Sequence, residues 1–484
     1  MGIDWYAQRT PSVQHLRSQG DRGNEGRGKR VVMQSTPGKA GGYGRLALGV
    51  LAGDNRVEKP LNLEAAMSRL QIRCTTIALL ALVLGCVQIG QGAPPAPYPW
   101  KAGVAAGKIT PKKPMWMAGY AARKKPSEGV TQELFAKALA LEDKDGGRVV
   151  IVTMDLIGVI PTLREAVEQQ VREKHKLPPE ALLMAASHTH CGPEYRHAKG
   201  AKDDKAEYFG FLADTVVRLV GESLKNLAPA QLTYGHARAG FAMNRRRNYQ
   251  LPKGDINENK APNPDGPVDH DVPVLLVSNP DDTPRAVVFG YACHSTTLGF
   301  YQFCGDYAGY AQEYLEKAHP GMAAMFLIGC GADQNPYPRS TLELAQQHGR
   351  SLATAVEAAL YAHPRPLRGP VRCALERIPL KKPTAPEPLS YPVQVIRFSS
   401  DITLVALASE VVVDYSLRLK RQLAAPPGMV WVSGYSNGYF GYIPSDRVLQ
   451  EGGYEAASWK TGIEEPIVSK VMELYKRLGA APGQ

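Results

Sequence analysis

The feature that most constrains the fold of this chain is an alternation of short β-branched runs with helical stretches, which begins at about residue 102. The short apolar runs, which are typical of buried strands, are Val149–Met154, Leu182–Ala186, Ala286–Ala292, Ala324–Ile328, Thr403–Ala408 and Val430–Ser433. The stretches that we predict to be helical are Pro161–Lys176, Tyr208–Leu227, Tyr307–Ala318, Leu342–His363, Val411–Ala424 and Pro466–Leu478. This order predicts an α/β fold with a mixed sheet flanked by helices. The Pro-rich segment Pro364–Pro388 is expected to connect two subdomains.

The first hundred residues follow a different pattern. Residues 1–66 contain eleven Gly with scattered Arg and Ser and show no sustained periodicity, which predicts disorder. Residues 67–92 have two Arg, an apolar stretch and then small residues, the layout of a secretory signal peptide. Because such a signal is read near the amino terminus, the simplest hypothesis is that translation starts at Met67 and that residues 1–66 are a mis-annotated upstream extension. We therefore expect an exported protein, secreted or periplasmic, with one large domain at residues 100–480.

The cysteines divide between this leader and the expected domain. Val83–Cys86 resembles a lipoprotein cleavage box, so Cys86 as a lipid-anchored first residue is an alternative to ordinary cleavage near residue 92. The remaining five are Cys191, Cys293, Cys304, Cys330 and Cys373. Five is an odd number, so at least one thiol is free or pairs with another chain, and the sequence leaves the pairing open.

Charge and hydropathy exclude two classes of protein. The formal net charge is +11, but residues 1–92 account for +6 of it, and the rest of the chain has no basic block. A nucleic-acid-binding protein needs a clustered basic face, so we expect no nucleic acid partner. The chain has no run of 18 apolar residues, which excludes a multi-span membrane protein.

Polar residues cluster where several of the expected strands end. His188 and His190 follow one strand, and they face the same side if that segment is extended. His294 follows a second strand, and Glu410 follows a third, where we expect a helix to begin. Two His, a carboxylate and an open position would suit a catalytic zinc ion, although the H-E-x-x-H helix of many metalloproteases is absent. Each residue alone also has a structural interpretation, such as a loop His, a hydrogen-bonded core His or a Glu at a helix start.

Several motifs in their order and spacing make the chain from about Ala102 to Leu478 similar to the catalytic domain of the neutral/alkaline non-lysosomal ceramidases. These motifs are Ser187–Pro193, Met243–Arg245, the His294 segment with Gly305–Tyr310, Ala332–Pro336, Ser409-Glu410, Asn437 with Tyr442, and Tyr454–Ala457. The resemblance implies an amide hydrolase that holds one zinc ion per chain. It implies that His188, His294, Glu410 and Tyr442 are the zinc ligands. It also implies that His190, Arg245 and Tyr454 line the substrate site.

The chain departs from the family pattern at two points. Asn335 stands where the family has a serine that is often assigned as the nucleophile. The chain also ends near residue 484, so we expect it to lack the family's C-terminal immunoglobulin-like domain. An amide side chain cannot accept an acyl group as a hydroxyl can, so we expect attack by zinc-activated water. Asn335 would then be a hydrogen-bonding residue held by a turn that Pro336 stiffens.

The resulting prediction is a zinc-dependent amidohydrolase that cleaves a small amphipathic N-acyl substrate, with a sphingolipid as one option and with contact to a membrane surface. His190 is the expected general acid or base, and Arg245 and Tyr454 would stabilise the oxyanion or hold polar substrate groups. One alternative is a non-catalytic zinc-containing relative that binds a lipid or sugar headgroup. Another is a serine hydrolase that uses Ser436, which lies in a G-x-S-x-G motif but lacks a following helix pattern. Asp155 would be either a hydrogen-bond partner of a ligand His or a helix cap.

Overall fold

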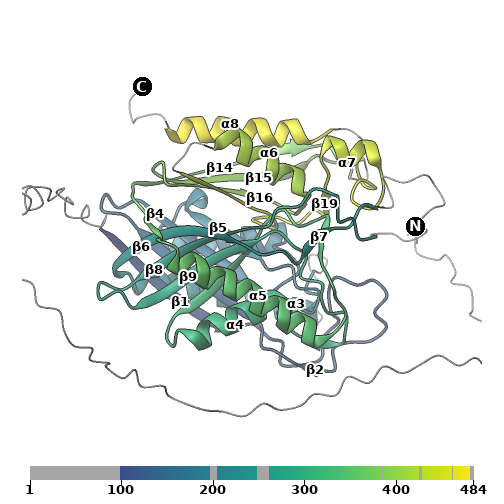
Figure 1. Ribbon diagram of the computed structural model, residues 1–484, viewed down its shortest axis with the longest axis horizontal. Helices are drawn as coiled ribbons and strands as arrows, with labels where there is room; N and C mark the ends of the chain where they lie inside the picture. Colours follow the sequence, from purple (N-terminus) through teal and green to yellow (C-terminus); the bar gives the residue numbers. More distant parts are fainter. Residues whose placement is uncertain are drawn as a thin grey trace, which may run out of the picture. The chain divides into compact units, whose positions relative to one another are not determined.

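Two β-sheets stacked face to face form the centre of the fold, and helices cover the outer face of each sheet (Figure 1). The computed structural model describes residues 99–196, 204–247, 261–383, 385–424, 428–460 and 462–479, all within one unit at residues 91–484. The expectations for residues 1–66, for the signal peptide at 67–92 and for the anchor at Cys86 lie outside the described residues. No helix within these ranges combines the length and the apolar composition needed to cross a bilayer.

The larger sheet has nine strands. In spatial order they are β11 (Ala323–Ile328), β9 (Pro284–Tyr291), β8 (Asp271–Ser278), β6 (Ala228–Arg238), β1 (Trp100–Lys108), β3 (Phe135–Glu142), β4 (Arg148–Met154) and β5 (Leu182–Ala186), with β13 (Arg365–Pro366) also paired to β6. The middle strands are antiparallel, whereas the outer pairs β4/β5 and β9/β11 are parallel. Parallel neighbours need a crossover. Helix α2 (Pro161–His175) and the short η1 (Pro179–Ala181) join β4 to β5, and α4 (Asp306–Ala318) lies between β9 and β11.

Strand alternation gives the large sheet two apolar faces. Ala138 and Val152 face outward and pack with residues of α2 and of α3 (Asp204–Lys225). On the same face, β8, β9 and β11 pack against α4 and α5 (Leu342–Tyr361). Leu139 and Ile151, one position along their strands, face the second sheet instead, as the period of two requires.

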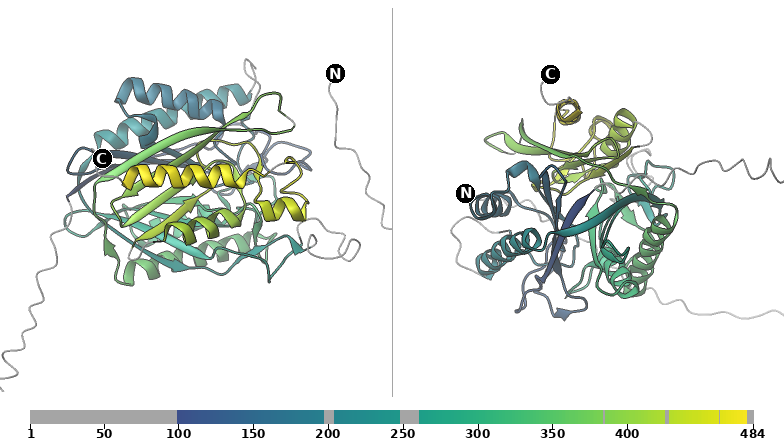
Figure 2. Two further views of the ribbon diagram at one scale, coloured as in Figure 1. Left: turned by 90° about the horizontal axis from the view of Figure 1, so that it is seen from above. Right: turned by 90° about the vertical axis from the view of Figure 1, so that its left-hand side faces the viewer.

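The smaller sheet contains four strands in the order β14 (Val371–Leu380), β15 (Leu389–Phe398), β16 (Ile402–Leu407) and β18 (Met429–Ser433). Leu404 and Trp431 pack against the large sheet, whereas Val405 and Val432 face α6 (Val413–Leu423) and α8 (Glu464–Gly479). The end-on view in Figure 2 shows the small sheet and its helices lying over the large sheet. The whole unit is therefore a four-layer sandwich of helices, sheet, sheet and helices.

Very short strand pairs form where the chain leaves the main strands. They are β7 (Ala242–Asn244) with β12 (Gln334–Pro336), β17 (Glu410–Val411) with β19 (Tyr442–Ile443), and β2 (Gly129–Val130) with β10 (Gln302–Phe303). The first pair puts Asn335 opposite Met243, and the second puts Glu410 opposite Tyr442. These pairs bring distant segments together, and in Figure 1 α7 (Asp446–Glu451) lies near β19 and away from β2.

The expected mixed α/β fold with flanking helices is confirmed, and every predicted strand and helix is present within a few residues of its expected ends. The prediction for Pro364–Pro388 is wrong in part, because this segment contains the ten-residue strand β14. Strand β14 pairs only with β15, and an edge strand of this kind tolerates Pro379 and weak apolar alternation. The expectation that residues 100–480 form one catalytic domain stays a prediction.

Candidate metal centre

Three buried histidines and a carboxylate meet where strands of both sheets end. His188 and His190 follow β5, His294 follows β9, and Glu410 starts β17 just after β16 of the small sheet. The first two loops are joined by a hydrogen bond from the His190 backbone N–H to the Ser295 carbonyl (3.2 Å). His188 has a left-handed backbone (φ 59°), so the expected extended geometry is wrong at this point, although both histidines still reach one site.

The polar atoms of this cluster face one another at short range. Oε2 of Glu410 lies 3.3 Å from Nε2 of His188 and 3.3 Å from Nε2 of His294. Nε2 of His190 lies 3.2 Å from Nε2 of His188. Tetrahedral ligands about 2.0–2.1 Å from a zinc ion are themselves about 3.3 Å apart, so these distances suit a shared cation.

The outer nitrogens of two imidazoles fix which atoms face inward. Nδ1 of His188 lies 2.7 Å from the Ile157 carbonyl, and Nδ1 of His294 lies 2.7 Å from the Gly331 carbonyl. A carbonyl only accepts, so each Nδ1 carries the proton and each Nε2 presents a lone pair to the centre. Nε2 of His294 and Oε2 of Glu410 have no hydrogen-bond donor among the described residues. Buried acceptors that face one another without a donor are costly, and a bound cation removes that cost.

The protonation states also fit a metal-binding donor set. Burial, followed by the charge of Arg245, lowers the pKa of His294 to about 3. Burial likewise places the pKa of His190 well below its usual value. Burial opposes ionisation of Glu410, but the neighbouring His188 and His294 overcome it and lower its pKa. At neutral pH the centre therefore offers the neutral imidazoles of His190 and His294 and an ionised Glu410 carboxylate, the forms that bind metal.

Two tyrosines approach the centre from the segment after β18. The Tyr439 hydroxyl donates to Oε1 of Glu410 (2.7 Å) and holds the carboxylate in place. The ring of Tyr442 stacks on His294 with centroids 6.5 Å apart, and its hydroxyl accepts from Nη2 of Arg245 (3.3 Å). Tyr442 as a metal ligand therefore stays a prediction, since its described hydroxyl contact is with a guanidinium.

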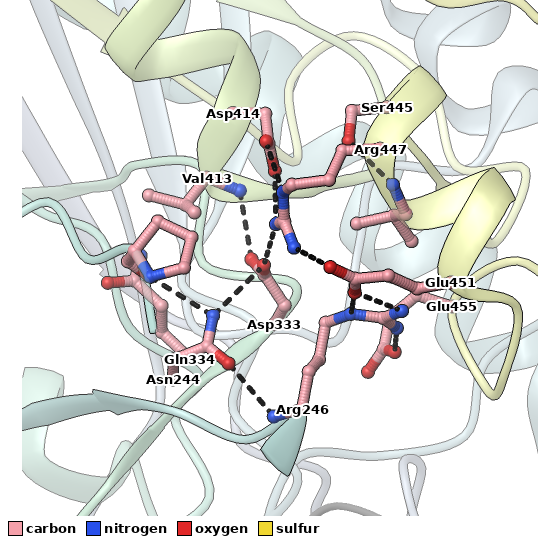
Figure 3. Close-up of polar contacts among 12 residues, drawn as sticks. Asn244, Arg246, Asp333, Gln334, Val413, Asp414, Ser445, Arg447, Glu451 and Glu455 are labelled. Carbon is pink, nitrogen blue, oxygen red and sulfur yellow. Dashed lines mark hydrogen bonds and ion pairs between the residues drawn. The ribbon is translucent and has the colours of Figure 1, made fainter. Parts of the chain in front are cut away.

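A buried charge network supports the side of the centre next to β7. Nε of Arg245 donates to Glu455 (3.0 Å), whose other oxygen accepts from Arg246. Figure 3 shows this second pair together with Glu451, which binds Arg246 at 3.0 Å, and the buried Asp333. Glu455 is fully buried and bridges the two guanidinium groups, so it orients Arg245 toward the centre.

Asn335 lies in the short strand β12 and not in the expected turn, which corrects that prediction. The difference arises because β12 pairs with β7 and so continues as a strand up to Pro336. The Asn335 side-chain oxygen accepts from Nη1 of Arg245 (3.1 Å) and from the Thr296 hydroxyl (3.4 Å). The amide thus belongs to the same polar wall as Arg245.

The predicted site residues share one cavity of about 600 Å³. Its lining includes all eight of them, namely His188, His190, Arg245, His294, Asn335, Glu410, Tyr442 and Tyr454. Tyr454 is 40% exposed and lies edge-on to Tyr442, with centroids 5.0 Å apart, at the outer part of the wall. The structure therefore brings together the complete predicted set, while the role of each residue stays a prediction.

Two sequence interpretations are not supported by the structure. Ser436 is fully buried, its hydroxyl donates to the Gly434 carbonyl (2.8 Å), and it is absent from the described lining of the cavity. No helix follows it as a nucleophile elbow requires, because β19 comes next. Asp155 accepts from the Phe135 N–H (3.0 Å) and from Gln312 (3.4 Å), so its described contacts make it neither a helix cap nor a histidine partner.

Sequence reasoning missed some residues that shape the site. Gly119 has φ +93°, and a Cβ there would lie 2.3 Å from the His190 ring. Nothing in the local sequence indicates this close approach. Glu455 lies within the motif Tyr454–Ala457, and Tyr439 lies between Asn437 and Tyr442, but only their contacts reveal what they do. The five cysteines within the described ranges are all free thiols.

Comparison with known proteins finds similar sequences and similar folds. Residues 100–327 match the sequence profile of the family described as neutral/alkaline non-lysosomal ceramidase, N-terminal. This part of the chain is similar to that family. It is 25% identical to the neutral ceramidase of Pseudomonas aeruginosa over 252 residues, which cover 49% of this chain and 37% of that protein. It is 25% identical to neutral ceramidase A of Dictyostelium discoideum over 220 residues, which cover 43% and 30% of the two chains.

Solved ceramidase structures share the fold. The crystal structure of the Pseudomonas aeruginosa neutral ceramidase superposes with a TM-score of 0.67 at 19% identity, over 79% of this chain and 76% of that one. A ceramidase complexed with C2 gives a TM-score of 0.67 at 18% identity, over 80% and 77% of the two chains. The sequence matches span about a third of the length of the two curated ceramidases.

Proposed function

We propose that this chain is a zinc-dependent amidohydrolase of the ceramidase family that cleaves an N-acylated amphipathic substrate. The observation that carries the proposal is the set of inward-facing acceptors, in which Oε2 of Glu410 lies about one tetrahedral ligand edge from Nε2 of His188 and from Nε2 of His294. His188, His294 and Glu410 would hold the ion. His190 and Tyr442 are the two candidates for a further ligand.

Zinc in such a site polarises a carbonyl oxygen and lowers the pKa of water toward neutrality. The remaining chemistry falls to the side chains around it. His190 lies within 3.2 Å of a ligand nitrogen and also lines the cavity, so it is placed to take a proton from an attacking water and to pass it to the leaving amine. Arg245 brings a guanidinium to the same wall, where negative charge would develop on the former carbonyl oxygen.

The presence of Asn335 in place of a serine leads us to expect water as the nucleophile. Asn335 lines the cavity where the family pattern has serine, and its amide cannot accept the acyl group. Its contact with Arg245 makes it a positioning residue for the oxyanion side of the cavity. No acyl-enzyme is therefore expected during turnover.

The substrate and the location are also part of this proposal. The names of the two similar ceramidases point to ceramide as the substrate. The exposed aromatic residues Trp116 and Tyr454 on the cavity lining suit an amphipathic acyl compound at a membrane surface. Residues 67–92 support export, to the periplasm or the medium.

The test is metal analysis combined with an amide-hydrolysis screen on the full chain. We expect about one zinc per chain and loss of activity on chelation that returns with zinc. His294→Ala should lose most of the metal, whereas His236→Ala, which changes a histidine on β6 outside the cluster, should keep it. A His294→Ala protein that still binds one zinc tightly would contradict the assigned centre.

The same assay distinguishes the two candidates for the further zinc ligand, His190 and Tyr442. Tyr442→Phe removes only a hydroxyl, and His190→Gln keeps a polar side chain of similar size. Whichever variant lowers the zinc content identifies the further ligand, and the other residue then acts on the substrate. Stoichiometric zinc with no turnover on ceramides, other N-acyl amines and esters would favour the non-catalytic alternative.

A further inference from the structure

A second cavity adjoins the candidate metal centre. It has a volume of about 300 Å³ and shares Tyr120, Arg123, Thr296 and Arg339 with the lining of the first cavity. Its described lining contains two guanidinium groups and several hydroxyl groups but no Asp or Glu. A polar cavity with positive charges and without carboxylates is suited to an anion.

Arg123 is built into the wall between the two cavities. It is 9% exposed, its guanidinium lies 4.9 Å from the centre of the Tyr120 ring, and it donates to the carbonyls of Ala118 and Phe300. Its Nε is buried without an oxygen or nitrogen partner in the described part of the chain. Carbonyl groups do not neutralise a guanidinium, so the wall keeps a buried positive charge with an unused donor.

Arg339 adds a second charge that is better placed to reach a ligand. It is half-buried, lines both cavities and makes no ion pair or side-chain hydrogen bond with any residue that the structure describes. The buried Asp306 influences the same Tyr120 hydroxyl, but its carboxylate already accepts from the N–H groups of Leu298 (2.9 Å) and Tyr307 (2.6 Å).

The acids on the first cavity are also engaged. Glu194 pairs with Arg196, and Glu410 faces the histidines. Neither is available to compensate Arg123 or Arg339. The positive charge at the junction of the two cavities is thus unmatched by the carboxylates that line them.

We infer that the second cavity is an anion subsite, in which Arg339 and Arg123 bind a carboxylate, sulfonate or phosphate group carried by the substrate. The inference rests on the proposed amide hydrolysis and narrows its substrate to N-acyl compounds with an anionic headgroup. Ceramide, whose headgroup is neutral, would leave this subsite without its counter-charge. A charge-assisted hydrogen bond to a guanidinium changes affinity by roughly tenfold or more.

The experiment compares matched substrates on the zinc-loaded full-length protein. N-dodecanoylglycine and N-dodecanoylglycinamide differ only in that the first has a carboxylate where the second has a neutral amide. The corresponding N-dodecanoyl derivatives of 4-aminobutyrate and 4-aminobutyramide form a second pair with a longer spacer. We expect kcat/KM to favour the carboxylate of at least one pair by about tenfold or more. The ratio should collapse in Arg339→Gln and recover in part in Arg339→Lys. Arg421→Gln, which removes an exposed charge at the end of α6, should leave the ratio unchanged.

The outcomes separate this inference from the proposed function. Equal rates within both pairs, or a ratio that Arg339→Gln does not change, would overturn the anion subsite while amide hydrolysis stands. The anion subsite would also be overturned if the kcat/KM ratio changed with the anionic lipid content of added vesicles and not with the charge of the substrate headgroup. If no N-acyl amine is cleaved, the proposed function fails. In that case calorimetric binding of the same compound pairs tests the anion subsite. The inference then requires the carboxylate of a pair to bind more tightly than the amide, and this difference to depend on Arg339.

Discussion

The buried carboxylate of Glu455 provides the sharpest test of how the site is held together. Its two oxygens bind Arg245 and Arg246, and all three side chains are at most 3% exposed. Glu455→Gln keeps the shape of the side chain but leaves two buried guanidinium groups with one fewer negative charge. Removing one partner of a buried ion pair costs about 3–5 kcal/mol.

The structure indicates where in that range the loss falls. Arg246 keeps Glu451 at 3.0 Å, and a glutamine oxygen can still accept one hydrogen bond. Among the described residues, Arg245 keeps hydrogen bonds to Asn335 and Tyr442, which are neutral. We therefore expect a loss of about 3 kcal/mol in the free energy of unfolding, which lowers the urea midpoint by about 1 M at a slope of about 3 kcal/mol/M.

Urea unfolding followed by tryptophan fluorescence measures this loss, and steady-state kinetics measures its effect on Arg245. Glu451→Gln is the matched control, because that side chain is 18% exposed, whereas Glu455 is fully buried, and because Arg246 keeps the charge of Glu455 in this variant. The control should lose about 1 kcal/mol or less. A Glu455→Gln protein that loses no more than the control would refute the reasoning.

Three further experiments test other parts of the site. Asn335→Ala should lower kcat/KM by less than about 10²-fold, and His190→Ala by more, because only the imidazole can move a proton. Burial, followed by the charge of Asp414, raises the pKa of Asp333 to about 7, so native protein takes up a proton on folding and loses stability as pH rises from about 4 to 7. Asp333→Asn should therefore gain about 2–3 kcal/mol relative to wild type between pH 5 and pH 8 in urea titrations, and a flat difference would contradict this. Gly119→Ala should displace the His190 ring and reduce turnover, whereas Gly146→Ala, at a similar φ but with open space around it, should lose stability alone.

The strands and helices that could be predicted from sequence are those with a continuous apolar signal. Leu182–Ala186 is buried on both faces, and its predicted bounds match the structure. Strand β14 alternates weakly because one of its faces is partly exposed at the edge of the small sheet, so its sequence pattern predicts a connecting segment. The existence of a second sheet follows from strand pairing, which no local pattern encodes.

The site shows the same division. His188, His294 and Glu410 could be found because polar residues directly after apolar strands are unusual. Glu455 could not, since a glutamate after a Gly-Gly pair is most often a surface residue, and its burial depends on two arginines some 210 positions earlier. The close approach of Gly119 to His190 depends on a positive φ, which cannot be predicted from a single glycine in the sequence.

The candidate metal ligands come from both sheets, and this arrangement affects the stability of the whole unit. His188 and His294 follow strands of the large sheet, and Glu410 follows a strand of the small one, so a cation held by all three cross-links the two layers. An ion present at a thousand times its dissociation constant would add about 4 kcal/mol to the free energy of separating those layers. Removal of the ion would therefore weaken the packing between the two sheets before it affected either sheet alone. Protease cleavage in the small sheet would therefore report on metal occupancy.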